Sequence, residues 1–509
     1  MKYVCTLLLS LAFSHPAFCQ ISLSTLSEIQ VGNIPDQDPA KLRTAYSQIN
    51  FDYTAAGFQA GLRSENFTAS QSGRNYGEIV QRYVHYRRAS FAATAGHFYT
   101  IFGNGLLLHA FELPGVITEV RGSRRRYQIS RDLDGVQLRY RRADLDFLVL
   151  RGTPVDSDLP PGLAGVDRRQ GRVQGGAVAW SPRTYIETGL GLVQFKAGGV
   201  DDLGADLYAR LRLTPLLDHL GLEEVYGDLY GEYAQRDAEL DRWFSLDRDL
   251  PRALYLSSTW TQGAWGLSLE YKDYEDFLIA NANNPPPLIR EHEAFLLNRI
   301  THDLLPDDET GFQTELSYAF ASGQMLTTNY TRAKRRNEPG TDDDDTLWEF
   351  YIQGDTPLNA ALDAQVFVDF SRNRILVDEH RTTVGTVWDW RPGARYNLNA
   401  DVQFQDIDRK FGTSAFPFNN FYVNLGLNRQ TAWSAALVLQ RSTDELETGA
   451  SLSGTTWWWG ANLNWQVHPG HNIDLFAGKR RSGLACTGGT CYEVLAFEGV
   501  SIRLLNQWF

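Results

Sequence analysis

The chain has 509 residues and a formal net charge of −13 at pH 7, with 43% hydrophobic, 12% aromatic and 21% charged residues. Its mean hydropathy of −0.33 excludes a membrane protein built from many helices, because each helical span needs about 20 consecutive apolar residues and no such run follows the N-terminal segment. The acidic balance also argues against nucleic acid as a partner.

Residues 1–19 have the features of a secretory signal peptide. Lys2 precedes an apolar core at residues 4–13, and small residues follow near position 17. We predict export and cleavage just before Gln20. Cys19 raises the alternative of lipid attachment, although Phe18 is an unfavourable residue before a lipidated cysteine.

Residues 20–43 are predicted to form a short periplasmic lead-in. A transporter of the plugged kind needs a separate globular domain inside its barrel, and this segment is too short to supply one. The remaining residues 44–509 are assigned to a single domain.

From about residue 44 to the end, many segments alternate between apolar and polar residues. Side chains of a β-strand point to opposite faces in turn, so such a strand has one apolar and one polar face. In residues 396–405 the apolar positions are Tyr396, Leu398, Ala400, Val402 and Phe404, and the polar ones are Asn397, Asn399, Asp401, Gln403 and Gln405.

The connections and strand lengths predict an all-β fold, a single large antiparallel transmembrane β-barrel. Its turns should be short on the periplasmic side and its loops long on the extracellular side. Links at residues 262–264 and 391–394 are tight, whereas long polar connections lie at residues 281–287, 334–346 and 408–420. At about 22 residues per strand and connection, the chain accommodates about 22 strands, within a range of about 18 to 26.

The chain also resembles an uncharacterised outer-membrane β-barrel family found mainly in Bacteroidota. The resemblance rests on the length, the mature start at Gln20 and the run His-Phe-Tyr-Thr-Ile-Phe-Gly-Asn-Gly-Leu-Leu-Leu at residues 97–108. It implies a porin-like barrel over nearly the whole mature chain. It implies no reaction, cargo or catalytic residue.

Four arginines on alternating segments are expected to face the interior of the barrel: Arg139, Arg141, Arg210 and Arg212. There they would attract anionic solutes and set selectivity, as rings of like charge do in pores. Alternatively, they pair with lumenal carboxylates such as Asp206, Asp228 and Glu232 to fill the interior. A third alternative concerns the arginines at residues 121–126, which would bind lipid phosphates from a surface loop.

The sequence shows no enzyme motif, since Gly-x-Ser-x-Gly, His-Glu-x-x-His and phosphate-loop patterns are absent. His292 lies between Glu291 and Glu293 and is predicted to be a surface histidine with satisfied hydrogen bonds. The acidic run at residues 342–345 is either a solvated loop or a loop that holds divalent cations. We predict no catalytic residue, no cofactor and no metal.

Two features near the C-terminus remain. Cys486 and Cys491 are the cysteines of the mature chain, and a local pair in an exported protein favours a loop disulfide over two neighbouring thiols. The chain ends on Trp508 and Phe509, which resembles the terminal strand that the bacterial barrel-assembly machinery recognises.

The predicted function is a porin-like channel in the outer membrane, for passive or selective passage of small hydrophilic solutes. The alternative is a non-conducting structural or adaptor barrel that anchors or assists a cell-surface complex. Expected partners are outer-membrane lipid, the barrel-assembly machinery during biogenesis and small solutes.

Overall fold

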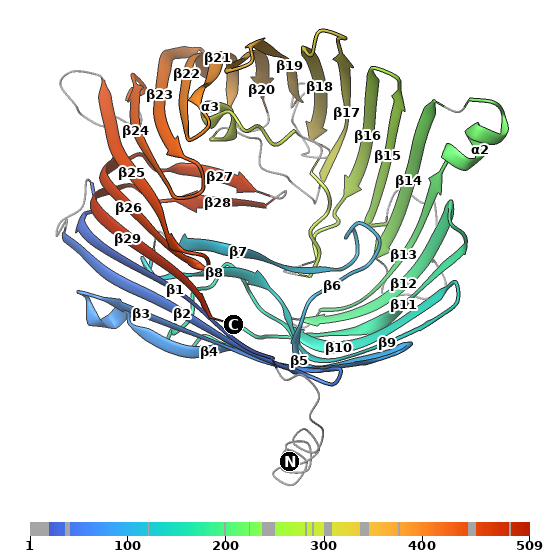
Figure 1. Ribbon diagram of the computed structural model, residues 1–509. Coiled ribbons are helices and arrows are strands. Elements are labelled where there is room, and N and C mark those ends of the chain that lie inside the picture. Colours follow the sequence, from blue (N-terminus) through green and yellow to red (C-terminus); the bar gives the residue numbers. More distant parts are fainter. Residues whose placement is uncertain are drawn as a thin grey trace.

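A closed ring of antiparallel strands dominates the computed structural model (Figure 1). Among the described residues, 24 strands form one sheet, in which every strand pairs with two neighbours. The prediction of a single all-β barrel is confirmed, with 24 strands in place of about 22. The described residues are 20–35, 41–120, 122–197, 200–222, 224–236, 250–279, 282–287, 290–299, 308–335, 346–374, 377–445, 455–487 and 490–508.

The ring follows the order of the chain. Its strands are β1 (Gln20–Asn33), β2 (Lys41–Ala55), β3 (Phe58–Ala69), β4 (Tyr76–Arg88), β5 (Phe91–Phe98), β9 (Leu133–Arg142), β10 (Leu145–Pro154), β11 (Arg172–Arg183), β12 (Ile186–Ala197), β13 (Val200–Arg212), β14 (Val225–Arg236), β15 (Arg252–Gln262), β16 (Trp265–Glu275), β17 (Asp308–Ala319), β18 (Met325–Arg335), β19 (Thr346–Asn359), β20 (Leu362–Asn373), β21 (Asp378–Gly393), β22 (Tyr396–Phe411), β23 (Ser414–Arg429), β24 (Trp433–Ser442), β25 (Thr456–His468), β26 (His471–Arg480) and β29 (Phe497–Trp508).

The other elements lie in the connections. They are the helical turn η1 (Ser72–Arg74), the strands β6 (Thr100–Ile101), β7 (His109–Glu119) and β8 (Arg126–Arg131), the helices α2 (Thr214–His219) and α3 (Phe295–Asn298), and the hairpin strands β27 (Gly483–Thr487) and β28 (Thr490–Val494). Among the described residues, no helix is both long and apolar enough to cross a membrane.

The N-terminal segment is part of the wall, so the prediction of a lead-in at residues 20–43 is wrong. β1 pairs with β2 on one side and with β29 on the other, which closes the ring. Its outward face carries Ile29 and Val31, but Thr25 and Ser27 interrupt the apolar pattern and hide the strand in the sequence. Without β1, two sheet edges would keep unpaired backbone groups.

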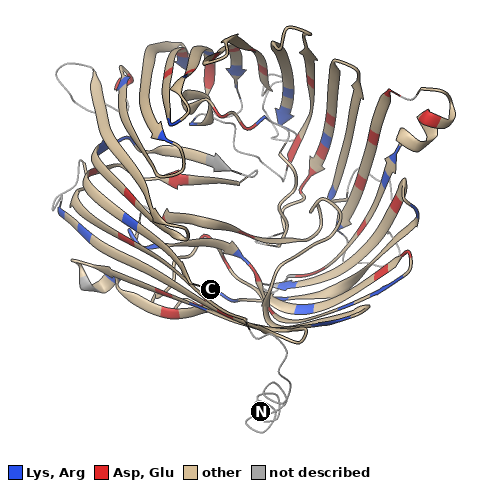
Figure 2. Ribbon diagram, viewed as in Figure 1, with Lys and Arg blue, Asp and Glu red and all other residues tan. Residues whose placement is uncertain are grey.

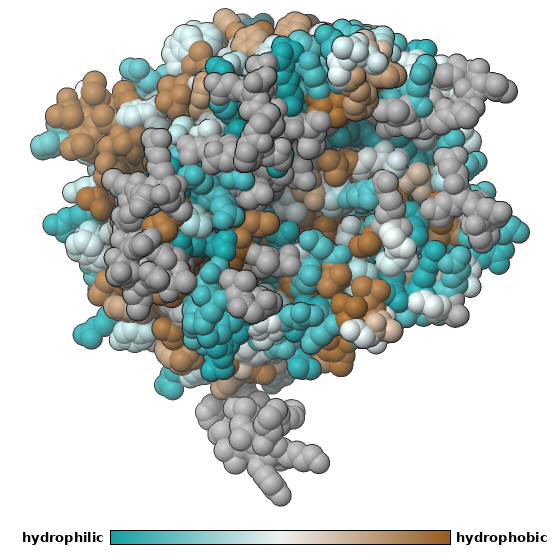
Figure 3. Space-filling model, turned by 180° about the vertical axis from the view of Figure 1, so that it is seen from behind, coloured by the Kyte–Doolittle hydropathy of each residue, from teal (hydrophilic) through white to brown (hydrophobic). Residues whose placement is uncertain are grey.

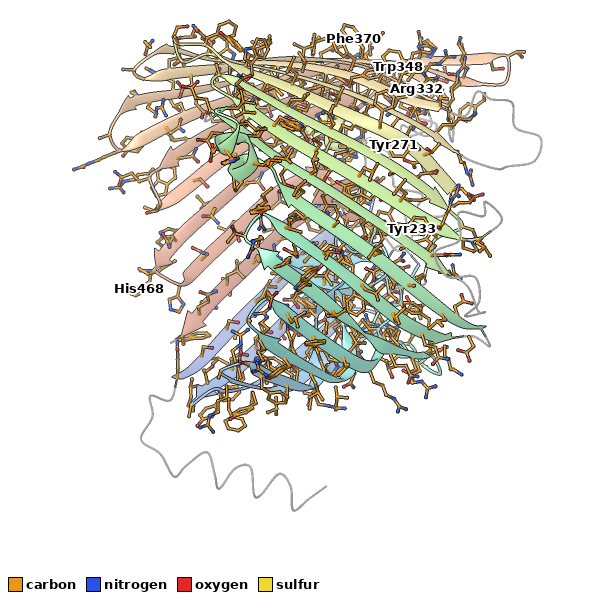
Figure 4. All side chains as sticks on the ribbon, turned by 90° about the vertical axis from the view of Figure 1, so that its right-hand side faces the viewer. Tyr233, Tyr271, Arg332, Trp348, Phe370 and His468 are labelled. Atoms are coloured by element: carbon orange, nitrogen blue, oxygen red, sulfur yellow. The ribbon has the colours of Figure 1, made fainter. Side chains whose placement is uncertain are left out.

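The two ends of the barrel differ. Tight links follow β2, β4, β9, β11, β15, β17, β19, β21, β23 and β25, and they define the short-turn end. Gln20 pairs with Thr54 beside the first of these turns, and Trp508 pairs with Leu23, so both described chain ends lie there. Figure 4 shows the strands crossing the wall obliquely, with His468 at the end of β25 on this side. The opposite rim is the long-connection end.

One predicted loop is absent. Residues 408–420 were expected to form a long loop, but β22 and β23 continue through them to a tight turn between Phe411 and Ser414. Ile407 and Phe418 are register partners and are buried, with 1% and 5% exposed. The hairpin therefore continues through this segment, because buried apolar residues still alternate with polar ones although the segment as a whole is rich in polar residues.

The outer face of the wall is apolar and open to its surroundings. Val366, Leu425 and Leu437 are each more than half exposed although they lie in the middle of long strands. Figure 3 shows hydrophobic surface on the outside of the ring. Aromatic side chains lie near the short-turn end of the outer face, among them Trp390 and Trp465. This distribution suits a wall that faces lipid.

Leu437, at the middle of β24, tests the lipid-facing assignment. In lipid vesicles, Leu437→Arg should lower the free energy of unfolding by about 2 to 4 kcal/mol, the cost of a cation at the midplane of a barrel wall. Denaturant titration of the reconstituted protein measures the change, with Leu437→Ala as the control for lost side-chain volume. Equal effects of the two substitutions would contradict a lipid-facing position.

Candidate functional site in the barrel lumen

Three segments fold from the long-connection end into the lumen (Figure 1). The first insert, residues 99–132, contains β6, β7 and β8, which form a small sheet separate from the wall. The second insert is the described part of residues 276–299 and includes α3. The third insert is the β27–β28 hairpin, residues 483–494. The connections of the barrel thus occupy its lumen.

The run at residues 97–108 is the root of the first insert. Phe102, Leu106, Leu107 and Leu108 are at most 2% exposed and belong to one apolar cluster with residues of the wall. Glu232 on β14 accepts hydrogen bonds from the backbone N–H groups of Asn104 (2.6 Å) and Leu106 (3.2 Å). The turn needs Gly103, which has a positive φ of 51° and whose Cβ would lie 2.5 Å from the Glu232 carboxyl carbon.

The second insert packs on the first. Asn283, 1% exposed, donates through Nδ2 to the backbone oxygens of Leu106 and Phe277, each at 3.0 Å. His109 N–H donates to the backbone oxygen of Ala282 at 2.8 Å. These hydrogen bonds join the two inserts into one body inside the ring.

The second insert also binds the wall at β19 and β22. His292 Nε2 lies 2.7 Å from Glu349 Oε1, and Leu296 N–H donates to Gln403 Oε1 at 2.9 Å. His292 is 3% exposed, so the prediction of a surface histidine is wrong. The reason is that its segment folds inward, where a histidine needs a protein partner.

The arginines that follow position 121 are buried inside the barrel. Arg126 Nη1 lies 2.5 Å from Glu28 Oε1, and Arg124 Nε lies 2.9 Å from Glu119 Oε1. Burial raises the pKa of Glu119, and the nearby Arg126 and Arg124 offset only part of that rise. Arg124, Arg125 and Arg126 are each at most 6% exposed, which rules out the lipid-phosphate alternative for these three; Arg121 lies outside the described residues.

A second ion pair ties the first insert to β3. Arg63 donates to both oxygens of Glu112 on β7, at 2.8 and 3.2 Å, and its Nε donates to Asn50 at 2.6 Å. Burial by itself would raise the pKa of Glu112, but the hydrogen bonds and the charge of Arg63 outweigh it, so the pKa is lowered.

Among the described residues, three cavities between the inserts and the wall differ in their lining. The first cavity, about 550 Å³, is lined by Asp52, Arg63 and Glu112 together with amide, hydroxyl, phenol and imidazole groups. The acidic cavity, about 620 Å³, is lined by the carboxylates Glu293, Asp355, Asp363, Asp389 and Asp401. The arginine cavity, about 370 Å³, is lined by Arg299, Arg480 and Arg481 together with the rings of Phe295, Tyr422 and Phe476.

The acidic cavity and the arginine cavity lie at different heights along the barrel axis. The acidic cavity includes Gly323 and Pro357, near turns of the short-turn end, whereas Arg480 ends β26 at the long-connection end. Glu293 of the second insert lines both cavities. Figure 2 shows charged residues of both signs around the ring. Lumenal charge therefore changes from basic to acidic along this side of the barrel.

The four predicted selectivity arginines lie near the short-turn end, on β9 and β13. Arg139 and Arg141 both donate to Asp146, with nitrogen–oxygen distances of 2.8 Å. Arg210 Nε lies 4.0 Å from Asp228, and Arg212 Nη2 lies 3.9 Å from Glu187. The structure thus places the four arginines as two separate pairs, one on β9 and one on β13, and every one of them has a carboxylate within 4.0 Å. Asp206 and Glu232, proposed as partners, instead lie buried beside the first insert.

The third insert contains the cysteine pair. Cys491 is disulfide-bonded, and Cys486 is its partner in the register of the β27–β28 hairpin. In the last strand Trp508 is 44% exposed on the outer face, while Phe509 lies outside the described residues. The acidic run at residues 342–345 also lies outside them. In the part of the chain that the structure describes, no group of three or more metal-ligating side chains occurs.

Sequence reasoning missed the inserts and the arginine cavity. The three consecutive leucines at residues 106–108 break the alternation and indicate burial on all sides, which was a usable signal for the first insert. No comparable signal marks Arg480 or Arg481, because two adjacent arginines at a strand end have the composition of an ordinary solvated loop.

Comparisons with known proteins support the fold and give no activity. Residues 22–175 match a family of unknown function, DUF6029. No curated protein matches the chain. A chain of the E. coli P pilus tip assembly intermediate PapC-PapD-PapK-PapG has 10% identity over 96% of this chain, with a TM-score of 0.51, and this chain covers 60% of that one.

Two solved structures from Pseudomonas aeruginosa are more distant in shape. OccK5 (OpdH) has 11% identity and a TM-score of 0.41, and the match covers 77% of this chain and 98% of that one. The outer membrane protein opdK has 11% identity and a TM-score of 0.40, over 73% of this chain and 98% of that one.

Glu112→Gln tests the anchoring of the first insert. The substitution removes the negative charge opposite a buried guanidinium, which costs on the order of 2 to 3 kcal/mol of local stability. Amide hydrogen exchange of residues 109–119 should become faster, while Glu498→Gln, at an exposed position on β29, leaves it unchanged.

The same ion pair sets a pH dependence. Because the pKa of Glu112 is lowered in the folded state, its stabilisation is complete above the ordinary glutamate pKa of about 4.3 and is lost as the pH falls through the lowered value. Exchange of residues 109–119, corrected for intrinsic rates, should match at pH 7 and pH 5 and rise below about pH 4. A rise already at pH 5 would contradict the assignment.

Proposed function

We propose that this protein is an outer-membrane channel through which small hydrophilic solutes pass passively, filtered by the charges of the lumen. The observation that carries the proposal is the pairing of an apolar outer wall with hydrophilic cavities of about 370 to 620 Å³ that remain beside the inserts. A barrel of this strand number encloses more space than wall side chains fill. The proposed role is transport and involves no enzymatic step.

The membrane location rests on physical grounds. A closed barrel satisfies every wall backbone group internally, which is the condition for strands to cross a bilayer. We propose that residues 1–19 direct export from the cytoplasm of a Gram-negative cell, of the Bacteroidota as the resemblance implies, and are then cleaved. The end of the chain at Trp508 and Phe509 would be recognised by the barrel-assembly machinery, and lipid would cover the outer face.

Selectivity would arise in two stages along the lumen. A solute entering at the long-connection end meets the arginine cavity, and one near the short-turn end meets the acidic cavity and the arginines Arg139, Arg141, Arg210 and Arg212. Fixed charges of opposite sign at different heights favour solutes that can pair with each charge in turn, and the inserts limit the size of the solutes.

One observation favours the second candidate, a non-conducting adaptor barrel. The first and second inserts are hydrogen-bonded to each other and to the wall, and the third contacts β7 of the first. A lumen filled from three directions in this way would suit an anchor for a surface complex if the remaining cavities do not connect.

Single-channel recording in planar bilayers separates the two functions. The wild type should conduct. Replacement of residues 483–494 by a short Gly-Ser linker should raise the unit conductance at least about twofold, because the hairpin occupies part of the lumen. The wall should remain closed, because β26 and β29 pair without the hairpin. The double substitution Cys486→Ser with Cys491→Ser retains the hairpin residues and serves as the control. Persistent silence of both the wild type and the deletion variant would favour the adaptor.

A further inference from the structure

We propose that the arginine cavity is a binding site for a small organic anion, a carboxylate joined to an apolar ring. The site lies between α3, the β27–β28 hairpin and the wall from β23 to β26. The proposal deepens the channel function by naming the class of solute, but the binding step itself does not depend on conduction.

The lining is strongly positive. Arg299, Arg480 and Arg481 contribute three guanidinium groups, whereas Glu293 is the one carboxylate among the lining residues of this cavity. Arg124 and Arg126 lie near enough to Arg480 to add to the positive potential, and Glu28 and Glu119 oppose it. An anion that enters the cavity is therefore attracted by a net positive charge in surroundings of reduced water content.

Arg480 is the decisive residue. Within the part of the chain that the structure describes, its guanidinium has no hydrogen-bond or ion-pair partner, and its Nε atom is buried. The group lies between two rings, with its Cζ 5.8 Å from the centroids of both Phe476 and Phe497. Ring contacts stabilise the cation but leave its buried Nε–H unsatisfied, and a carboxylate would accept from the guanidinium.

Other lumenal arginines show what a purely structural role looks like. Arg409 Nε lies 2.6 Å from Glu379 and its Nη1 lies 2.9 Å from Asp444. Arg126 is likewise paired with Glu28. For these two arginines the chain itself supplies the carboxylate. Arg480 departs from this pattern at a cavity, which points to an anion that the chain itself does not provide.

The remaining arginines are held in place. Arg481 is 6% exposed, donates through Nη1 to Asn420 Oδ1 at 3.2 Å and lies 4.9 Å above the ring of Trp458. Arg299 lies 5.5 Å above the ring of Phe295. Side chains that are fixed before binding lose little conformational entropy when the ligand arrives, so a cavity of this kind binds with less penalty.

The apolar part of the lining determines the rest of the ligand. Phe295 and Tyr422 stack in parallel, with ring centroids 4.3 Å apart, and the hairpin adds Leu484, Ala485 and Val494. Inorganic anions gain nothing from this surface, whereas a ring attached to a carboxylate would pack on it. Benzoate, which combines the two parts at a size well below 370 Å³, is a suitable probe.

Isothermal titration calorimetry of the full chain in detergent tests the proposal. Benzoate should bind saturably, inorganic phosphate at least about tenfold more weakly, and benzyl alcohol not measurably, because it lacks the charge. Arg480→Gln should weaken benzoate binding at least about tenfold, and Arg480→Lys, which keeps the charge, by less. The control is Arg441→Gln, the same change of charge on β24 beside the exposed Trp457.

The outcomes separate cleanly. Absence of benzoate binding, or equal affinity in the wild type and Arg480→Gln, would overturn the site. Phosphate binding as tight as benzoate binding would overturn the organic class. A loss caused by misfolding would also appear in Arg480→Lys and in the circular dichroism of the variant. Binding without conductance in bilayers would contradict the channel and leave the site intact.

Discussion

The structure depends on the closure of the ring by β1 and β29. Each strand edge carries a row of N–H and C=O groups, and in a lipid environment an unpaired edge would leave all of them without hydrogen bonds. The eleven-residue register between the two strands, from Leu23 opposite Trp508 to Asn33 opposite Glu498, removes the last two edges. The first residues after the proposed cleavage site thus have a structural role that a periplasmic lead-in would not have.

Closure at this strand number creates the second constraint, a wide lumen. Barrels of about eight strands are filled by their own side chains, but larger ones enclose a channel or a plug. In this chain the filling comes from the connections, and the apolar run at residues 106–108 packs against the wall in the manner of a small core. Because β5 pairs directly with β9, and β26 with β29, the inserts are additions to a wall that is already continuous.

Buried charge distinguishes the parts of the lumen that hold the inserts from a part that is open to a ligand. In each of the pairs Arg63–Glu112 and Arg126–Glu28, the two charges compensate each other across the boundary between insert and wall. Arg480 has no such partner among the described residues. Desolvated cations without a counter-ion are costly, so their retention at a cavity is more readily explained by binding than by packing.

The sequence by itself determined the wall. Alternation in segments such as residues 396–405 predicts which side chains face outward, because a strand has a strict period of two whatever its neighbours are. Polar residues hid two parts of it, β1 and the extension of the β22–β23 hairpin. Only the tertiary structure decided where the inserts lie and which charges meet. Glu232 and Asn283 each form a hydrogen bond with Leu106, which lies more than 120 residues away along the chain, and no local periodicity encodes contacts that exist only after the ring has closed.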